Sequence, residues 1–147
     1  METNTIRTRT QEIPRRRWPA FFEEFSRRHD GWLVDVEELI AERGAQKEIS
    51  GLPFHGASAV ASPRPSVAIE VGRGADDHIE HRIEDCRRIW VEILEGGAEA
   101  AVEIESAGGR RTLLEFRSPQ PVEAVDGMAA PLSRRKRRSK PPSARIR

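Results

Sequence analysis

The chain has 147 residues, of which 37% are hydrophobic and 33% are charged. This length accommodates one domain with a hydrophobic core and excludes two domains of ordinary size. The low apolar and high charged fractions favour a small folded body with disordered ends. No stretch approaches the roughly 18 apolar residues of a membrane-spanning helix, so we expect no membrane partner.

The net charge of +1 conceals an acidic body and a basic tail. Residues 131–147 hold eight of the 25 basic residues and no acidic one, which leaves 17 basic against 24 acidic residues elsewhere. Such a tail is typical of segments that contact nucleic acid or an acidic protein; the alternative is a passive, solvated tail. Because the tail has no aromatic residue, we expect any nucleic-acid binding to be weak and non-specific. The residues expected to make these contacts are Arg134, Arg135, Lys136, Arg137, Arg138 and Lys140.

Cysteine usage indicates the compartment. Cys86 is the single cysteine, so the chain cannot form an internal disulfide, and this fits a reducing environment. The N-terminal residues lack the apolar core of a secretory signal. We therefore expect a cytoplasmic protein.

The first expected element is an amphipathic helix. Residues 1–12 are polar and without periodicity, and predict a disordered arm. An aromatic series with the i, i+3, i+4, i+7 spacing of one helical face follows. Pro19 is compatible with the first turn of this helix, and Gly31 is a natural left-handed stop. The aromatic residues of the series are Trp18, Phe21, Phe22 and Phe25.

After Gly31 the hydrophobic period changes to two, as in half-buried strands. Residues 46–54 are interrupted by Gly51 and Pro53, which predicts an edge or bulged strand. Turn residues recur at intervals of roughly ten residues, which favours antiparallel connections. The expected strands cover residues 32–36, 46–54, 66–71, 78–83, 89–93, 102–104 and 112–116.

Together these elements predict a single α+β domain over residues 13–128. Its N-terminal helix packs on a small antiparallel β-barrel or curled meander sheet of about six or seven strands. Residues 129–147 are expected to form a disordered basic tail.

Two sets of residues carry a family likeness. The residues at the start are Ile13, Pro14, Arg15, Trp18, Phe21, Phe22, Phe25, Ser26, Arg27, His29, Gly31 and Trp32. The segments at the end are 104–106, 112–114, 116–119 and 125–127. The pattern resembles a family of small bacterial proteins of unknown function, the domain of unknown function 5335, over about residues 12–128. The resemblance implies a one-domain cytoplasmic bacterial protein, brings no activity or cofactor, and leaves the basic tail as an extension.

A metal site is the first chemistry to weigh. His78 and His81 share a face in a helix, but in the expected strand their side chains point to opposite faces. A zinc site needs three or four ligands, and Cys86 would have to be one of them. We expect no metal and no other cofactor, and interpret the two histidines as half-buried strand residues.

The other candidates also favour structural roles. Cys86 precedes two arginines that would lower its pKa, but it follows Asp85, and we interpret it as a small hydrophobic residue near a strand start. His29 is expected in the last helical turn, in contact with Trp32. His55 is expected in a glycine-rich loop, which assigns it no role.

Alternation places Glu103, Glu105 and Glu115 on the outer face of two strands that we expect to pair. They are either acid–base carboxylates or a solvated acidic face, and we favour the solvated face. Across this hairpin it would be neutralised by the nearby Arg110, Arg111 and Arg117.

These observations lead to two functional hypotheses of different classes. The first is a non-enzymatic binding or adaptor protein whose acidic body contacts a protein partner and whose basic tail adds electrostatic affinity. The second is a small-ligand-binding barrel or an enzyme whose site is assembled from scattered residues. The sequence names no catalytic residue, and the first hypothesis is preferred because no His, Asp, Ser or Cys set converges in it.

Overall fold

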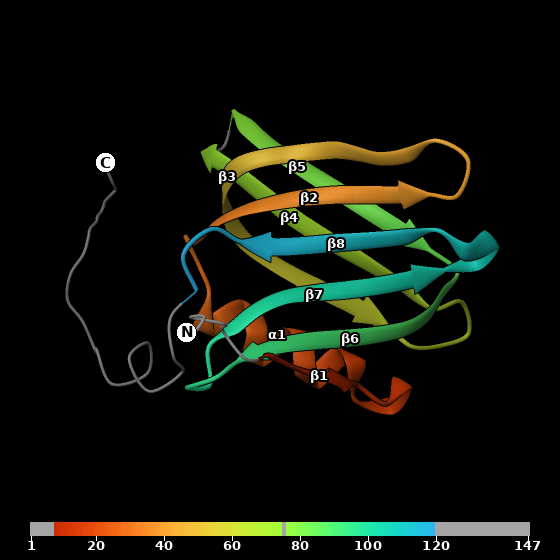
Figure 1. Cartoon of the computed structure of the whole chain (residues 1–147). Coiled ribbons are helices and arrows are strands. Elements are labelled where there is room, and N and C mark those ends of the chain that lie inside the picture. Colours follow the sequence, from red (N-terminus) through yellow and green to blue (C-terminus); the bar gives the residue numbers. More distant parts are fainter. Residues whose placement is uncertain (1–7, 75, 120–147) are drawn as a thin grey trace, which may run out of the picture.

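The structure is a computed structural model that describes residues 8–74 and 76–119. One α-helix and eight strands make up the described part, with two short 3-10 helices (Figure 1). In chain order the elements are β1 (Thr8–Glu12), η1 (Arg15–Arg17), α1 (Trp18–Arg28), β2 (Leu33–Ile40), β3 (Gly44–Val60), β4 (Ser66–Gly74), β5 (Asp77–Glu84), β6 (Cys86–Leu94), β7 (Glu99–Ser106), η2 (Ala107–Gly109) and β8 (Arg111–Phe116).

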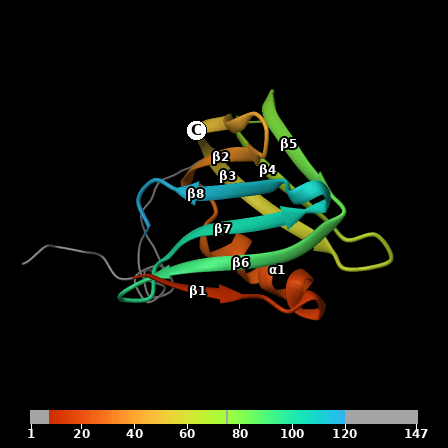
Figure 2. The same ribbon diagram turned by 45° about the vertical axis from the view of Figure 1, so that its right-hand side comes forward.

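The strands form one antiparallel sheet in the order β1-β6-β7-β8-β2-β3-β4-β5. Strands β6 to β8 and β2 to β5 each form a meander, and the pairing of β8 with β2 joins the two. The sheet curls strongly without closing, so β1 and β5 are its edges (Figure 2). The predicted α+β class with a helix on a curled antiparallel sheet is broadly right. The predicted strand number was too small, and the suggested closed barrel was wrong.

Strand β1 corrects the expected disordered arm at residues 8–12. It pairs with β6, with Thr10 opposite Glu92 and Glu12 opposite Trp90. All five of its residues are exposed, so the strand has no hydrophobic alternation to reveal it. Its order depends on hydrogen bonds to a segment about 80 residues away in the chain, which local sequence does not contain.

The long strand β3 bends from one half of the sheet to the other. Its first part pairs with β2 and its second part with β4, so it is a central strand rather than the expected edge strand. The predicted bulging is confirmed, because the register with β2 shifts twice. Gly51 lies in this bent region at a φ of 65°, a left-handed conformation that favours glycine.

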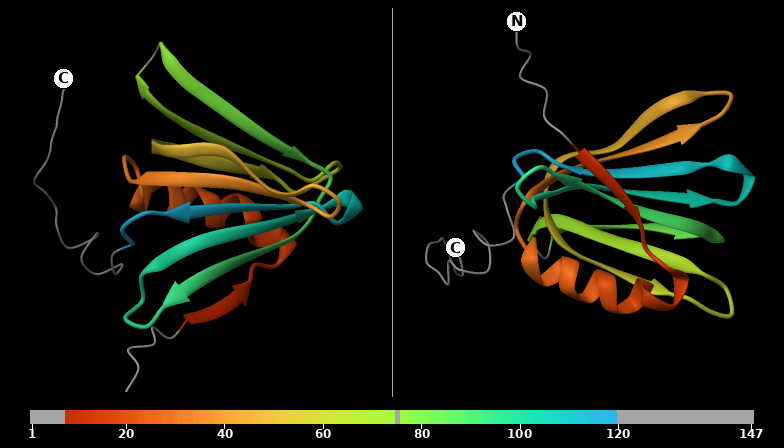
Figure 3. Two further views of the ribbon diagram at one scale, coloured as in Figure 1. Left: turned by 45° about the horizontal axis from the view of Figure 1, so that its top comes forward. Right: turned by 60° about the horizontal axis from the view of Figure 1, so that its bottom comes forward.

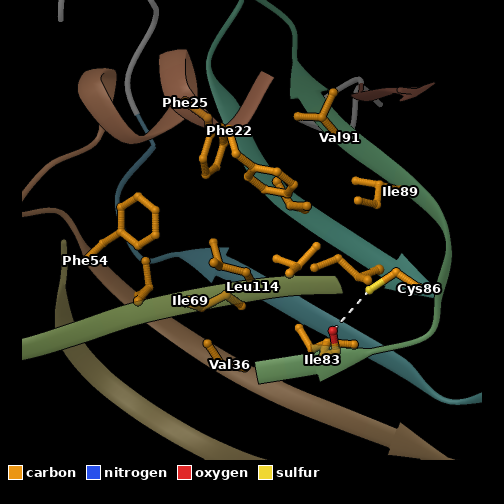
Figure 4. Packing of buried hydrophobic residues seen from close by; sticks show 14 of the residues in the cluster. Phe22, Phe25, Val36, Phe54, Ile69, Ile83, Cys86, Ile89, Val91 and Leu114 are labelled. Carbon is orange, nitrogen blue, oxygen red and sulfur yellow. Dashed lines mark hydrogen bonds between the residues drawn. The ribbon is translucent and has the colours of Figure 1, made fainter. Parts of the chain in front are cut away.

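Helix α1 packs against β3 on the concave side of the sheet, as Figure 3 shows. Its aromatic series was predicted to face the core, and Trp18, Phe22 and Phe25 are all buried. Phe25 lies between Phe54 of β3 and Phe116 of β8, with ring centroids 5.8 and 5.5 Å away. Figure 4 shows the rings of Phe22, Phe25 and Phe54 beside aliphatic side chains of the inner sheet face. The helix therefore supplies the aromatic half of the core.

Candidate functional site

The outer face of the strands β1-β6-β7-β8-β2 is not covered by α1 or by another described element. Figure 1 looks onto it, with α1 on the far side. Inner positions such as Val91, Val102 and Leu114 are buried, so the alternating positions between them point outward. We call this surface the outer acidic face; it consists of Glu12, Asp35, Glu37, Arg88, Trp90, Glu92, Glu103, Glu105, Arg111, Leu113 and Glu115, with Lys47 and Arg117 at its rim.

Trp90 lies near the centre of the outer acidic face. Its cross-strand partners are Glu12 on β1 and Glu103 on β7. The guanidinium groups of Arg88 and Arg111 lie 5.9 and 5.6 Å from the centre of its ring, within the range of cation–π attraction. The half-buried indole is therefore already a binding surface for cationic groups within this molecule.

Some carboxylates of this face are neutralised by neighbouring cations. Arg111 forms an ion pair with Glu103, as the sequence suggested it would across this hairpin. Arg88 lies 4.0 Å from Glu12. In contrast, Glu92, Glu105 and Glu115 form no ion pair with any residue that the structure describes. The face therefore keeps an excess of negative charge.

The rim of the face is held by Asp35 and Arg117. The guanidinium of Arg117 donates to both oxygens of Asp35, at 2.9 and 3.3 Å, and the N–H of Gly51 donates to Asp35 at 2.8 Å. The hydrogen bond from Arg117 is the main cause that lowers the pKa of Asp35 from its ordinary value. The same pairing raises the pKa of Arg117. This pair joins the end of β8 to the start of β2.

The three glutamates of the β7–β8 hairpin lie on the outer face of the sheet, where the alternation of the sequence predicted them. Strands β7 and β8 pair as expected, and Glu103, Glu105 and Glu115 share the outer face. Glu115 lies opposite Ala101, and Glu105 lies opposite Arg111, so no two of these carboxylates are direct cross-strand partners. The geometry favours the solvated acidic face over an acid–base pair.

The histidines separate as the strand prediction required. His81 points to the inner side, where its Nε2 lies 3.4 Å from Glu38. His78 lies near Glu70 and stacks on His55, with ring centroids 6.4 Å apart. No group of three or more His, Cys, Asp or Glu side chains within residues 8–74 and 76–119 is arranged to hold a metal ion.

His55 lies in β3 rather than in a loop. Its Nε2 donates to the carbonyl oxygen of Gly72 at 2.7 Å, and its Nδ1 lies 4.0 Å from Asp30. Burial raises the pKa of Asp30 from its ordinary value, and the charge of His55 acts in the opposite direction. This contact ties the end of the helix to the β3–β4 hairpin.

His29 occupies a buried polar cluster that the sequence did not predict. Its expected contact with Trp32 is confirmed, with ring centroids 4.7 Å apart. Its Nδ1 donates to the carbonyl oxygen of Phe25 at 2.7 Å, and its Nε2 lies 3.4 Å from Glu99. Arg28 donates to both oxygens of the nearly buried Glu99, at 2.9 and 3.0 Å. The cluster anchors the C-terminal turn of α1 to β7.

Cys86 is buried at the start of β6, which confirms its interpretation as a small hydrophobic residue. Figure 4 shows its thiol pointing into the core, where Sγ donates to the carbonyl oxygen of Ile83. Burial, followed by the negative charge of Glu84, raises the pKa of Cys86 to about 11. A thiol in this state is a poor nucleophile at neutral pH.

The basic tail residues expected to contact nucleic acid or an acidic partner, from Arg134 to Lys140, lie outside the described residues. Their role stays a prediction. Among the described residues no helix is long and apolar enough to cross a membrane.

The fold and this surface define a small, mostly β domain: an open curled sheet with one α-helix in its described part and an acidic outer face. The chain belongs to a family of unknown function, DUF5335, whose model matches residues 9–125. This confirms the family resemblance carried by the opening and closing motifs. Searches of curated proteins and of solved structures gave no match.

Proposed function

We propose that this protein is a non-enzymatic binding module, and that its outer acidic face binds a basic segment of a protein partner. The observation that carries the proposal is the set of carboxylates around Trp90 that lack an ion-pair partner in the described chain. The proposal places the protein in the cytoplasm, an expectation that rests on its single cysteine.

The aromatic ring and the charges of the outer acidic face both support a basic protein segment as its partner. Arg88 and Arg111 already bind the Trp90 ring, so the chemistry of the face suits further guanidinium and ammonium groups. An aromatic residue surrounded by charged groups is typical of the energetic centre of a protein interface. Glu92, Glu105 and Glu115 have no ion-pair partner among the described residues. They would speed association with a cationic partner and gain charge-assisted hydrogen bonds from it.

The test uses a fluorescent peptide rich in arginine and lysine, titrated with the full chain at low and near-physiological salt. We expect binding that weakens as salt rises, and at least a tenfold loss of affinity when Glu92, Glu105 and Glu115 are all changed to Gln. The matched control changes Glu23, Glu42 and Glu95 to Gln; these exposed residues lie off the face and form no ion pair in the described chain. Equal losses in both triple variants would show that only net charge matters, and would refute a defined site.

Trp90 provides a second arm of that test. Trp90→Ala removes the central ring without changing the charge, and we expect a further loss of peptide affinity of about tenfold. Unchanged affinity in a folded Trp90→Ala protein would remove the aromatic centre from the proposal.

The basic tail is proposed to add weak, non-specific affinity for nucleic acid. The full chain and a full-length variant with Arg134, Arg135, Arg137 and Arg138 changed to Gln are titrated with a labelled DNA duplex and an RNA duplex across salt concentrations. If only the unmodified chain binds, with a steep dependence on salt, the tail is a nucleic-acid arm. If neither protein binds at near-physiological salt, the tail contributes no affinity for nucleic acid under those conditions.

A further inference from the structure

A cleft of about 380 Å³ lies between β5 and the turn that joins β7 to β8. It is separate from the outer acidic face, because Glu38 lines it from the inner side of β2. Its volume falls within the range of small-molecule sites. The charged residues that line it are Glu38, Arg82, Glu84, Asp85 and Arg110.

Glu38 is the innermost charged group of this cleft. It lies directly opposite Thr112 in the β2–β8 register and shares an inner face with the buried Val36. Its side chain is 14% exposed, and its Oε2 lies 3.4 Å from Nε2 of His81, on β5. The carboxylate therefore lies where the two halves of the curled sheet meet.

The polar groups beside Glu38 are incompletely hydrogen-bonded. Thr112 is fully buried and its hydroxyl has no hydrogen-bond partner among the described residues. The same holds for Nε2 of His81, whose approach to Glu38 has the distance of an ion pair without hydrogen-bond geometry. Native proteins leave few such groups unsatisfied. Both groups lie beside Glu38, and Glu38 is the residue of the three that lines the cleft, so its carboxylate is the point at which a ligand can join this network.

The wall of the cleft also carries backbone strain. Asp85 has a φ of 51°, the only positive value among non-glycine residues of the described chain. The turn after β7 holds it in place, since the N–H of Ala107 donates to the carbonyl oxygen of Asp85 at 3.0 Å. Strained residues of this kind persist where the surrounding structure enforces them, and they concentrate at functional sites.

The two arginines at the cleft differ in availability. The guanidinium of Arg82 lies 2.9 Å from Glu80 and 4.0 Å from Glu84, so its charge is engaged. Arg110 forms no ion pair with any residue of the described chain. Of the three carboxylates of the cleft, that of Glu38 is nearly buried, whereas those of Glu84 and Asp85 are exposed. Arg110 supplies the guanidinium that has no ion-pair partner among the described residues.

We propose that this cleft binds a small zwitterion of the amino-acid class, whose ammonium group contacts Glu38 and whose carboxylate contacts Arg110. An ammonium group donates in three directions, so it satisfies Glu38 while leaving the imidazole of His81 beside it. A carboxylate accepts two parallel hydrogen bonds from a guanidinium. This inference is independent of the binding of a basic protein segment on the outer acidic face.

The test is calorimetric titration of the full chain with each of the twenty amino acids. We expect at least one to bind with a Kd below about 1 mM. Glu38→Gln and Arg110→Gln should each weaken that binding about tenfold or more, because each removes a charge-assisted hydrogen bond. Arg43→Gln is the matched control at an exposed turn residue outside the cleft.

Putrescine and succinate test the zwitterion itself, since each carries only one of the two charge types. Both should bind at least about tenfold more weakly than the best amino acid. The proposal is overturned if no amino acid binds, if putrescine binds equally well, or if Arg110→Gln, at the exposed rim, leaves binding unchanged. The variant with Glu92, Glu105 and Glu115 changed to Gln should keep full amino-acid binding, which separates this site from the outer acidic face.

Discussion

The hydroxyl group of Ser26 on α1 forms two hydrogen bonds with the backbone of Ala57 on β3. It donates to the carbonyl oxygen at 3.0 Å and accepts the N–H at 2.8 Å. Both backbone groups lie on the side of β3 that faces away from β4, beyond the point where pairing with β2 ends at Pro53. One side chain of the helix thus takes the place of a neighbouring strand.

Replacing Ser26 by Ala should lower the free energy of unfolding by about 1–3 kcal/mol. The substitution leaves the N–H and C=O of Ala57 without their partner in a half-buried place. Urea unfolding followed by circular dichroism measures the effect. Ser58→Ala, at an exposed neighbour, should change stability by less than about 0.5 kcal/mol. Equal effects of the two substitutions would contradict the role given to Ser26.

Removing the ring of Phe22 should lower the free energy of unfolding more than Ser26→Ala does. Phe22 is 1% exposed and lies in the main hydrophobic cluster, so Phe22→Ala should lower the free energy of unfolding by about 3–5 kcal/mol. Phe21 is only partly buried, and Phe21→Ala should cost clearly less. A loss under about 1 kcal/mol for Phe22→Ala would mean that the aromatic face of the helix is exposed in solution.

Much of the fold was accessible from hydrophobic periodicity, because burial on one face imposes it. The helix beginning at Trp18 has aromatic residues at helical spacing, and in the strands containing Val67 and Val102 every second residue is a large apolar one. All three elements form as predicted. Strand β1 was missed because an edge strand exposed on both faces has no such pattern. Strand β3 was placed at an edge because Gly51 and Pro53 are rare in central strands, whereas they lie here where the strand bends.

The candidate sites were only partly accessible, because they depend on which strands become neighbours. Parity alone placed Glu103, Glu105 and Glu115 on one outer face. The hydrogen bond from Arg117 to Asp35 joins residues 82 positions apart, and no local sequence pattern indicates it. The meeting of Glu38 with His81 depends likewise on the curl of the whole sheet.

The pair of Asp35 and Arg117 should make the free energy of unfolding depend on pH in the acidic range. The hydrogen bond from Arg117 lowers the pKa of Asp35 below its ordinary value of 3.8, so the native state favours the ionised form. The resulting stabilisation is complete above about pH 4 and is lost as the pH falls through the lowered pKa. Unfolding measured from about pH 5 to pH 2 should show this loss, and Asp35→Asn should remove that component.

Arg117→Gln should act on the same titration. Without the guanidinium, the pKa of Asp35 returns toward 3.8, which a carboxyl titration followed by NMR measures directly. Arg43→Gln, at an exposed turn residue without an ion pair in the described chain, should leave that pKa unchanged. An unaltered pKa of Asp35 in Arg117→Gln would show that the pair does not persist in solution.

The thiol of Cys86 should be unreactive in the folded protein. Burial raises its pKa from 9.0 to about 11, so at pH 8 only about one molecule in a thousand carries the thiolate that reacts with iodoacetamide. Labelling followed by mass spectrometry should be slow under native conditions and complete after unfolding in guanidinium. Rapid labelling of the native protein would show that the β6 end of the core opens readily.

The same raised pKa predicts a loss of stability in alkali. An unfolded chain releases the thiol proton near pH 9, whereas the folded chain holds it until about pH 11. The stabilisation from the buried neutral thiol is therefore complete below pH 9 and falls as the pH rises toward 11. Cys86→Ala removes this component at the cost of a small cavity, so its free energy of unfolding should decline less steeply over that interval than that of the unmodified chain. Parallel declines in the two proteins would assign the alkaline loss to other groups.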